Sequence, residues 1–437
     1  MESLLAARLL MALSLSFHII FAVVGMIMPV MMSISHWKWL KTRDDEYYKL
    51  TRWWMKGFGI FFATGAVSGT TLSFELGLLW PTFMEHAGPI FGMPFSWEGT
   101  AFFLEAIFLG LYLYGFKRMH PWTHWLSGVG IGVTGVASGL FVIAANSWMN
   151  SPQGFDWVNG VAMNIDPVKA MFNDAWLSQA QHTLVTATLA VSMAVLGIHS
   201  GFLYFGHKSS INRKAISIAA PLFVISALLS PVSGDLAAKD VARRQPVKLA
   251  AMESHFETEK RAGLWLGGIP NVKEQKVEYG IKIPGALSFL AGGDIEYEVK
   301  GLNDYPRENW PPVLIVHIAF QVMVAIGSFA GLIGLIILFS KWRKIDLTSK
   351  HQFLLFMMLS TPLGFIAIEA GWIVTEVGRQ PWIIYEILKT ADSVSPMPSI
   401  HYSLFLFLGL YSFLAFMVGW LMFRQFKQFN LMDGKNV

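Results

Sequence analysis

The sequence contains no cysteine and little charge. Without cysteine, the chain cannot form disulfides, iron–sulfur clusters, thiolate–zinc sites or covalently attached c-type heme. Charged residues make up 14% of the 437 residues, against about 25% in an ordinary soluble protein. Hydrophobic residues make up 54%, so the chain cannot cover a globule with polar side chains and is expected to lie in a membrane. A net charge of +4 is too small to indicate a nucleic-acid partner.

Nine stretches are apolar enough to cross about 30 Å of hydrocarbon as helices of roughly 20 residues. They lie near residues 5–34, 54–80, 95–116, 124–148, 176–205, 215–233, 313–339, 353–377 and 400–423. Backbone groups in lipid must be hydrogen-bonded within the segment, and the alternating pattern of barrel strands is absent. The first span is too long for a signal-peptide core and is expected to be retained. We therefore expect an all-α integral membrane protein with nine transmembrane helices.

Basic residues are distributed unevenly between the two sides that nine crossings define. One side carries 17 of them: Lys38, Lys41, Arg43, Lys49, Arg52, Lys117, Arg118, Lys208, Arg213, Lys214, Lys341, Arg343, Lys344, Lys350, Arg424, Lys427 and Lys435. The other side carries 4: Arg8, Lys169, Arg379 and Lys389. Because cytoplasmic loops are enriched in Lys and Arg, the N-terminus is expected outside and the C-terminus in the cytoplasm.

One long polar connection, residues 234–312, would then lie outside the membrane. Connections of this length are usually functional or disordered. A helical patch is expected around Leu249–Ala262, on which Glu253 and Glu257 would share a face. The chain shows no internal repeat and divides into residues 1–233 (helices 1–6), the loop 234–312, and residues 313–437 (helices 7–9 and the tail), forming one structural unit.

Several ionisable side chains fall inside the apolar spans, where a charged residue costs about 2.5–3.5 kcal/mol on insertion scales. These candidates are His18, Glu75, Glu98, Glu105, His182, His199, His317, Glu369 and Glu376. Glu98 and Glu105 lie two helical turns apart and would share one face, which suits a proton relay or an ion path. The alternative is a pair of carboxyls hydrogen-bonded to neighbouring helices.

Glu369 and Glu376 repeat this spacing, and Gly378 and Pro381 close the helix beyond them. A carboxylate at Glu376 could ligate a metal, pair with Arg379 or gate protons.

A lone histidine on an apolar helix is more often a hydrogen-bonded packing residue than a metal ligand. His182 and Met323, however, lie at comparable depth below the outer ends of their spans. They could therefore clasp one heme iron, a ligation that raises the redox potential, although Met also fills core gaps. The remaining histidines lie in or beside loops and are expected at the surface: His36, His86, His120, His124, His207, His255, His351 and His401.

On the loop, Glu253 and Glu257 could accept protons from an oxidised quinol, because close carboxylates raise one another's pKa. Lys248 could donate a hydrogen bond to a quinone oxygen. The alternative is a solvated amphipathic helix.

Two runs of sequence are the most specific features. They are Gly371-Trp372-Ile373-Val374-Thr375-Glu376-Val377-Gly378-Arg379-Gln380-Pro381-Trp382 and Gln245-Pro246-Val247-Lys248-Leu249-Ala250-Ala251-Met252-Glu253, and Gly301-Leu302-Asn303-Asp304 also fits. With the nine spans and the external loop after the sixth, the chain resembles subunit I of the bd-type quinol oxidases over nearly its whole length.

The resemblance implies metal ligands by position. His182 and Met323 match the axial pair of a low-spin heme b. His18 and Glu376 match the axial ligands of two high-spin hemes, one a heme b and the other a heme d or a further heme b.

The resemblance also implies roles around these hemes. Trp372 matches a residue packed among them, and Arg379 matches one placed to interact with their propionates. Glu98 and Glu105 match glutamates that ligate or deliver protons near the high-spin pair.

Lys248, Glu253 and Glu257 match the quinol-oxidation site, in a loop of the shorter type. The chain has Gln321 where some members carry Arg, which bears on the potential and propionate pairing of the low-spin heme.

The implied activity is that of a quinol:oxygen oxidoreductase in a bacterial or archaeal plasma membrane. Such an enzyme oxidises ubiquinol or menaquinol at the outer face and reduces O2 to water with cytoplasmic protons, generating a proton motive force without pumping. The implied partners are a second membrane subunit, subunit II, and often a small single-helix subunit.

Other classes fit less well. A diheme cytochrome b of the bc type needs paired histidines on two helices, and a heme–copper oxidase needs adjacent histidines; the sequence has neither. The non-enzymatic alternative is a proton- or cation-coupled transporter that uses the intramembrane glutamates, but no internal repeat typical of transporters is found.

Overall fold

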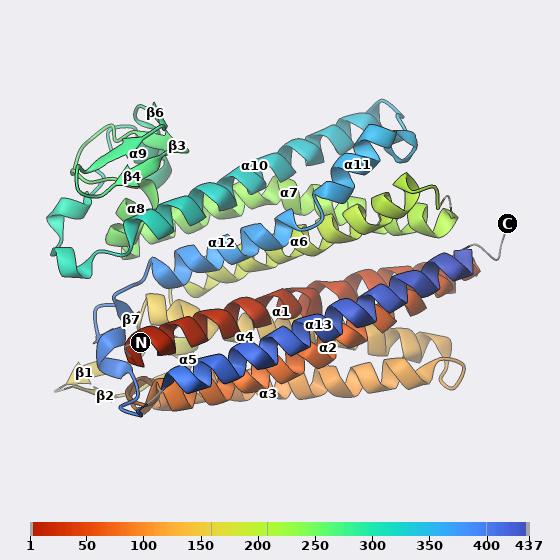
Figure 1. Cartoon of the computed structure of the whole chain (residues 1–437), viewed down its shortest axis with the longest axis horizontal. Helices are drawn as coiled ribbons and strands as arrows, with labels where there is room; N and C mark the ends of the chain where they lie inside the picture. Colours follow the sequence, from red (N-terminus) through yellow and green to blue (C-terminus); the bar gives the residue numbers. More distant parts are fainter. Residues whose placement is uncertain (1–2, 159, 208, 399, 434–437) are drawn as a thin grey trace.

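The computed structural model describes residues 3–158, 160–207, 209–398 and 400–433, which form a bundle of long helices with a small folded region at one end (Figure 1). Lys208 and Lys435, counted above for the orientation, lie outside the described residues. The long helices are α1 (Ser3–Thr42), α2 (Asp45–Leu79), α3 (Pro81–Gly115), α4 (Pro121–Asn150), α6 (Trp176–Tyr204), α7 (Ser210–Arg244), α10 (Val313–Trp342), α11 (His351–Leu359), α12 (Leu363–Val377) and α13 (Ile400–Asp433). α1 begins at one end of the bundle and α13 finishes at the other.

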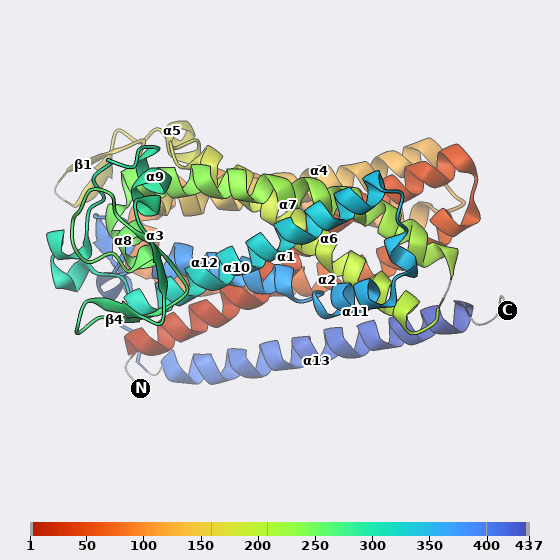
Figure 2. The same cartoon turned by 90° about the horizontal axis from the view of Figure 1, so that it is seen from above.

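Within the described residues, eight helical stretches are long and apolar enough to cross a membrane. The predicted third span lies on α3, which is 35 residues long and packs along α4. α3 is not among the eight; its apolar half contains both Glu98 and Glu105, which lower its mean hydropathy. α13 lies at the periphery of the bundle (Figure 2), and few of the side chains described on it are buried.

Most helices extend beyond the predicted spans, and two differences bear on the site. The span 353–377 is not one helix: α11 ends at Leu359 and α12 begins at Leu363. Pro362 explains the break, since proline lacks a backbone donor and disfavours helical geometry in the residue before it. α7 continues past the predicted end at residue 233 to Arg244, so that the long loop begins only at Gln245.

The long connection is folded, not disordered. It contains α8 (Pro246–Glu253), β3 (Leu264–Leu266) paired with β6 (Ile281–Ile283), β4 (Ile269–Asn271) paired with β5 (Lys276–Glu278), α9 (Ala286–Gly292), and the 3₁₀ turns Leu302–Asp304 and Arg307–Asn309. β1 (Asp156–Val158), β2 (Val161–Met163), α5 (Pro167–Met171), β7 (Trp382–Ile384), β8 (Leu388–Lys389) and the 3₁₀ turn Thr390–Ser393 lie at the same end of the bundle, and the 3₁₀ turn Leu347–Ser349 precedes α11.

The helical patch expected over Leu249–Ala262 is wrong in its second half. α8 ends at Glu253 because Ser254 adopts a left-handed conformation with φ of 50°, and the amide of His255 returns to the carbonyl of Ala250 at 2.8 Å. Glu253 and Glu257 therefore do not share a helical face. Glu253 is fully buried, whereas Glu257 is exposed and accepts a hydrogen bond from Asn303 at 2.6 Å.

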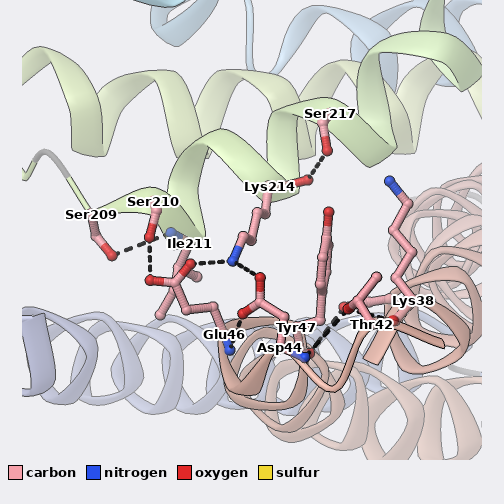
Figure 3. A network of polar contacts seen from close by, with 11 residues as sticks. Lys38, Thr42, Asp44, Glu46, Tyr47, Ser209, Ser210, Ile211, Lys214 and Ser217 are labelled. Atoms are coloured by element: carbon pink, nitrogen blue, oxygen red, sulfur yellow. Dashed lines mark hydrogen bonds and ion pairs between the residues drawn. The ribbon is translucent and has the colours of Figure 1, made fainter. Parts of the chain in front are cut away.

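At the opposite end of the bundle, an ion-pair network joins the beginning of α2 to the beginning of α7 (Figure 3). Lys214 donates to Asp44 and Glu46, and Ser210 donates to Glu46. Asp44 also caps α2 by accepting from the Glu46 amide at 3.0 Å. The hydrogen bond from Lys214 holds the pKa of Asp44 below its usual value.

Removal of this network is expected to destabilise the fold measurably. Lys214→Met should lower the free energy of unfolding by about 1 kcal/mol, the upper end for a partly exposed pair, and thermal unfolding in detergent would measure it. Arg213→Met is the matched control, because Arg213 reaches Asp346 only at 3.6 Å and both side chains are half exposed. An effect of Arg213→Met as large as that of Lys214→Met would contradict this account.

Candidate functional site

His18 and His182 are held in the same way by a serine of a neighbouring helix. Nδ1 of His18 lies 3.0 Å from Oγ of Ser68, and Nδ1 of His182 lies 3.0 Å from Oγ of Ser233. Each hydroxyl donates to a carbonyl three residues earlier in its own helix, at 3.2 and 3.1 Å. Each serine oxygen therefore accepts from Nδ1–H, which leaves the lone pair on Nε2. This is the tautomer and orientation that iron ligation through Nε2 requires.

His199 differs, because both of its ring nitrogens are engaged. Nε2 accepts from the indole of Trp54 at 3.2 Å, so Nδ1 carries the proton and donates to Oδ1 of Asn212 at 2.8 Å. This buried histidine has no lone pair left for a metal, and its role is structural.

Bare glycine backbone faces three of the four expected ligands. A Cβ added at Gly69 would lie 2.8 Å from Cε1 of His18, and one at Gly371 would lie 3.2 Å from Sδ of Met323. A Cβ at Gly234 would lie 3.8 Å from Cε1 of His182, which is ordinary contact. Gly371 thus brings Met323 of α10 against α12. The next residue, Trp372, packs against the main hydrophobic core.

Glu376 lies in the last turn of α12 and has partners on both carboxylate oxygens. Oε2 accepts from Nη2 of Arg379 at 2.5 Å, and Oε1 accepts from Nδ2 of Asn146 on α4. Only 2% of the Arg379 side chain is exposed, and its Nε and Nη1 have no hydrogen-bond partner among the described residues. Two unsatisfied buried donors require an acceptor, and a carboxylate such as a heme propionate fits them. The residues present therefore fit a heme.

α8 carries two buried ionisable groups. Lys248 is 3% exposed and donates to Oδ1 of Asn150 at 2.6 Å and to the carbonyl of Thr375 at 3.2 Å. Burial and the neighbouring Arg379 lower the pKa of Lys248 to about 7. Glu253 is 0% exposed, and neither carboxylate oxygen has a partner within the described ranges. Burial raises the pKa of Glu253 to about 8.

A small polar cavity of about 80 Å³ lies between α8 and the segment after α12. Its lining includes Lys248, Tyr305, Asn309, Arg379 and Tyr385. The cavity borders both α8 and the Arg379 guanidinium. It therefore lies between the loop helix and the residues that fit a heme propionate.

α10 holds the loop through two residues one turn apart. Nδ1 of His317 lies 2.8 Å from the carbonyl of Met252, the residue before Glu253. Gln321 donates to the carbonyl of Trp265 and accepts from the amide of Gly267, both at 2.9 Å. Gln321 therefore fixes the loop to the helix that carries Met323.

The two glutamates of α3 both face α4. Ser138 donates to Glu98 at 3.1 Å, and an added Cβ at Gly135 would lie 3.1 Å from Oε1 of Glu105. Oε1 of Glu105 is buried without a partner in the part of the chain that the structure describes. The remaining intramembrane glutamates are Glu75, which accepts from Ser14 at 2.8 Å, and Glu369.

Three histidines expected at the surface are buried, so that expectation was wrong for His36, His124 and His255. α1 extends to Thr42, which places His36 within a helix, where its Nδ1 lies 3.0 Å from the Tyr112 hydroxyl. Sequence reasoning also missed Asn146 and Asn150, whose only signal was two amides at i,i+4 spacing in an apolar helix.

These features define a multi-pass helical membrane protein with imidazole, thioether and carboxylate groups, the side-chain types that ligate heme iron, inside its bundle. Residues 6–430 match the family described as cytochrome bd terminal oxidase subunit I. The chain belongs to this family.

Relatives match over nearly the full length. The chain is 34% identical to a Bacillus subtilis (strain 168) protein assigned as subunit I of a cytochrome bd menaquinol oxidase, over 98% of this chain and 97% of that protein. It is 29% identical to subunit 1 of the cytochrome bd-II ubiquinol oxidase of Escherichia coli (strain K12), over 92% of each. A solved structure of the bd oxidase from Geobacillus thermodenitrificans matches with a TM-score of 0.91 and 38% identity, over 98% of this chain and 99% of that one.

Proposed function

We propose that the chain is the heme-bearing subunit of an oxidase that takes electrons from quinol at the loop end of the bundle and delivers them to O2. Its family is that of quinol oxidases. The observation that carries the proposal is the pair of serine-held histidines, His18 and His182, each with the Nε2 lone pair free.

His182 and Met323 would hold a low-spin heme b, while His18 and Glu376 would hold two high-spin hemes, one of type b and one of type d or b. Bound hemes would supply the one-electron steps between quinol and O2. Arg379 would bind propionates through its free Nε and Nη1. Trp372, one residue from the glycine against which Met323 lies, would pack between the hemes.

Quinol would bind beside α8 and release two electrons and two protons. Glu253 is the proton acceptor we favour, because its carboxylate is buried and makes no competing hydrogen bond within the described part of the chain. Two quinols supply the four electrons that reduce O2 to two waters. The family resemblance also places Lys248 and Glu257 at this site, but Glu257 is exposed and bonded to Asn303, so we assign it no part in the proton transfer.

We further propose nine crossings, with α3 as the ninth, the N-terminus outside and the C-terminus cytoplasmic. The connections at the end where α13 finishes carry most of the basic residues, which supports this orientation. Quinol protons would then leave outside, and the protons for water would enter from the cytoplasm past Glu105 and Glu98. This separation generates a proton motive force without a pump.

Glu105→Gln is expected to slow oxygen turnover by about tenfold or more, since general acid–base groups contribute at least that much. The absorption of the low-spin heme should stay unchanged, because Glu105 lies on α3 against α4, whereas His182 and Met323 lie on α6 and α10. Glu85→Gln, an exposed glutamate of the same helix, is the matched control. Normal turnover in Glu105→Gln would remove this residue from the proton path.

The chain would work in the plasma membrane with subunit II and, in many family members, a small single-helix subunit; the quinol would be ubiquinol or menaquinol. A cation-coupled transporter is the alternative, and it is not favoured by the family match.

The experiment that tests the proposal is quinol-driven oxygen consumption by the purified complex, followed alongside heme reduction. We expect quinol to reduce all hemes in the wild type and none in His182→Ala. A colourless protein that consumes no oxygen would favour the transporter.

A further inference from the structure

A line of hydrogen bonds connects the loop helix α8 to the end of α12 through α4. Nζ of Lys248 donates to Oδ1 of Asn150 at 2.6 Å. Nδ2 of Asn150 donates to Oδ1 of Asn146 at 3.2 Å and to its carbonyl at 2.9 Å. Nδ2 of Asn146 donates to Oε1 of Glu376, which also accepts from Arg379 through its other oxygen.

Which atom donates and which accepts in each bond follows from Lys248, the first residue of this line. An ammonium group only donates, so Asn150 must turn its oxygen toward Lys248 and its NH₂ toward Asn146. Asn146 then presents oxygen to Asn150 and NH₂ to Glu376. The orientations of both amides are thus set by Lys248, and all donors point toward the Glu376 carboxylate.

The ends of the line are closely packed. Lys248 and Asn150 are both buried, and a Cβ added at Gly378 would lie 3.1 Å from Cγ of Lys248. Lys248 also donates to the carbonyl of Thr375, the residue before Glu376. A buried polar group that loses its partner costs about 1–3 kcal/mol, so removal of Lys248 would favour an arrangement in which the Asn150 amide finds another partner.

We propose that Asn146 and Asn150 are positioning residues that link the position of the Lys248 side chain to the orientation of the Glu376 carboxylate. The quinol loop would thereby set the orientation of an iron ligand. The inference rests on the proposed function, since Glu376 is the expected ligand of a high-spin heme. The sequence alone suggested that Lys248 donates a hydrogen bond to a quinone oxygen. In the structure Lys248 instead donates to Asn150 and to the carbonyl of Thr375, next to Glu376.

The test uses the purified complex without quinol and reads the high-spin heme absorption and its affinity for carbon monoxide. Lys248→Met, Asn150→Ala and Asn146→Ala should each shift the high-spin bands and change the carbon monoxide affinity by at least about twofold, as expected for residues in one network. The low-spin band should not move. The double variant Lys248→Met/Asn150→Ala should equal the larger single effect.

Lys239→Met is the matched control, because Lys239 pairs with Asp235 on its own helix at 2.6 Å, and it should leave both readouts unchanged. Asn150→Asp replaces Asn150→Ala if that variant does not fold, since it keeps the acceptor for Lys248 and loses the donor to Asn146. Unchanged high-spin bands in Lys248→Met, or additive effects in the double variant, would overturn the link. Absence of heme from the wild type would instead overturn the proposed function.

Discussion

Gly69→Ala is expected to lower retention of the heme that we propose His18 to hold by about 10–100-fold, the range for residues that orient a metal ligand. The added methyl group would lie 2.8 Å from Cε1 of His18. The ring cannot turn away freely, because Nδ1 is bonded to Ser68 on the same helix as Gly69. The imidazole must therefore shift, and Nε2 leaves its position. Absorption spectra and heme extraction of the purified variant measure the loss.

Two other glycines provide matched controls for this prediction. The methyl group of Gly371→Ala would lie 3.2 Å from Sδ of Met323 and should perturb the absorption of the low-spin heme to a smaller degree. The methyl group of Gly234→Ala would make only ordinary contact with His182, at 3.8 Å, and should leave the heme spectrum and heme retention unchanged. Equal spectra for Gly69→Ala and Gly234→Ala would show that His18 does not hold a heme in the described position.

Glu253→Gln is expected to lower the rate of quinol oxidation by about 100-fold or more, the usual contribution of a general base. The pH dependence identifies the group. With its pKa raised to about 8, the Glu253 carboxyl is protonated at lower pH and cannot accept a proton. The wild-type rate of heme reduction by quinol should therefore rise with pH up to about 8 and then level off. The variant should be slow and lack this rise.

Glu257→Gln is the control for the second prediction. Glu257 is exposed and bonded to Asn303, whereas Glu253 is fully buried, so replacement of Glu257 should leave both the rate and the pH profile close to the wild type. A Glu253→Gln variant that keeps the wild-type pH profile would exclude Glu253 as the proton acceptor.

Much of the fold could be predicted from the sequence because membrane helices depend on length and hydropathy. The spans 176–205 and 313–339 agree closely with α6 and α10. The interruption before α12 and the end of α8 at Ser254 could not be read from apolarity. The first depends on a local proline effect inside an apolar run, and the second on a left-handed serine whose neighbours favour helix.

The candidate site could be predicted only in its ionisable members, since a charge or imidazole in lipid is itself a signal. Ser68, Ser233 and Asn146 carry no such signal, because small polar residues are common in membrane helices. Their roles depend on the rotation of one helix against another. Taken singly, His182 and His199 look alike in the sequence, and only the depth shared with Met323 and the family resemblance favoured His182. The structure adds the physical difference, because Nε2 of His182 is free and both nitrogens of His199 are engaged.

A pyridine hemochromogen assay with pigment extraction tests the central claim most directly. The account predicts three hemes per purified complex, loss of one in His18→Ala and of the low-spin heme in His182→Ala, and no loss in His199→Ala. A complex without bound tetrapyrrole, or a full heme complement in both His18→Ala and His182→Ala, would contradict it.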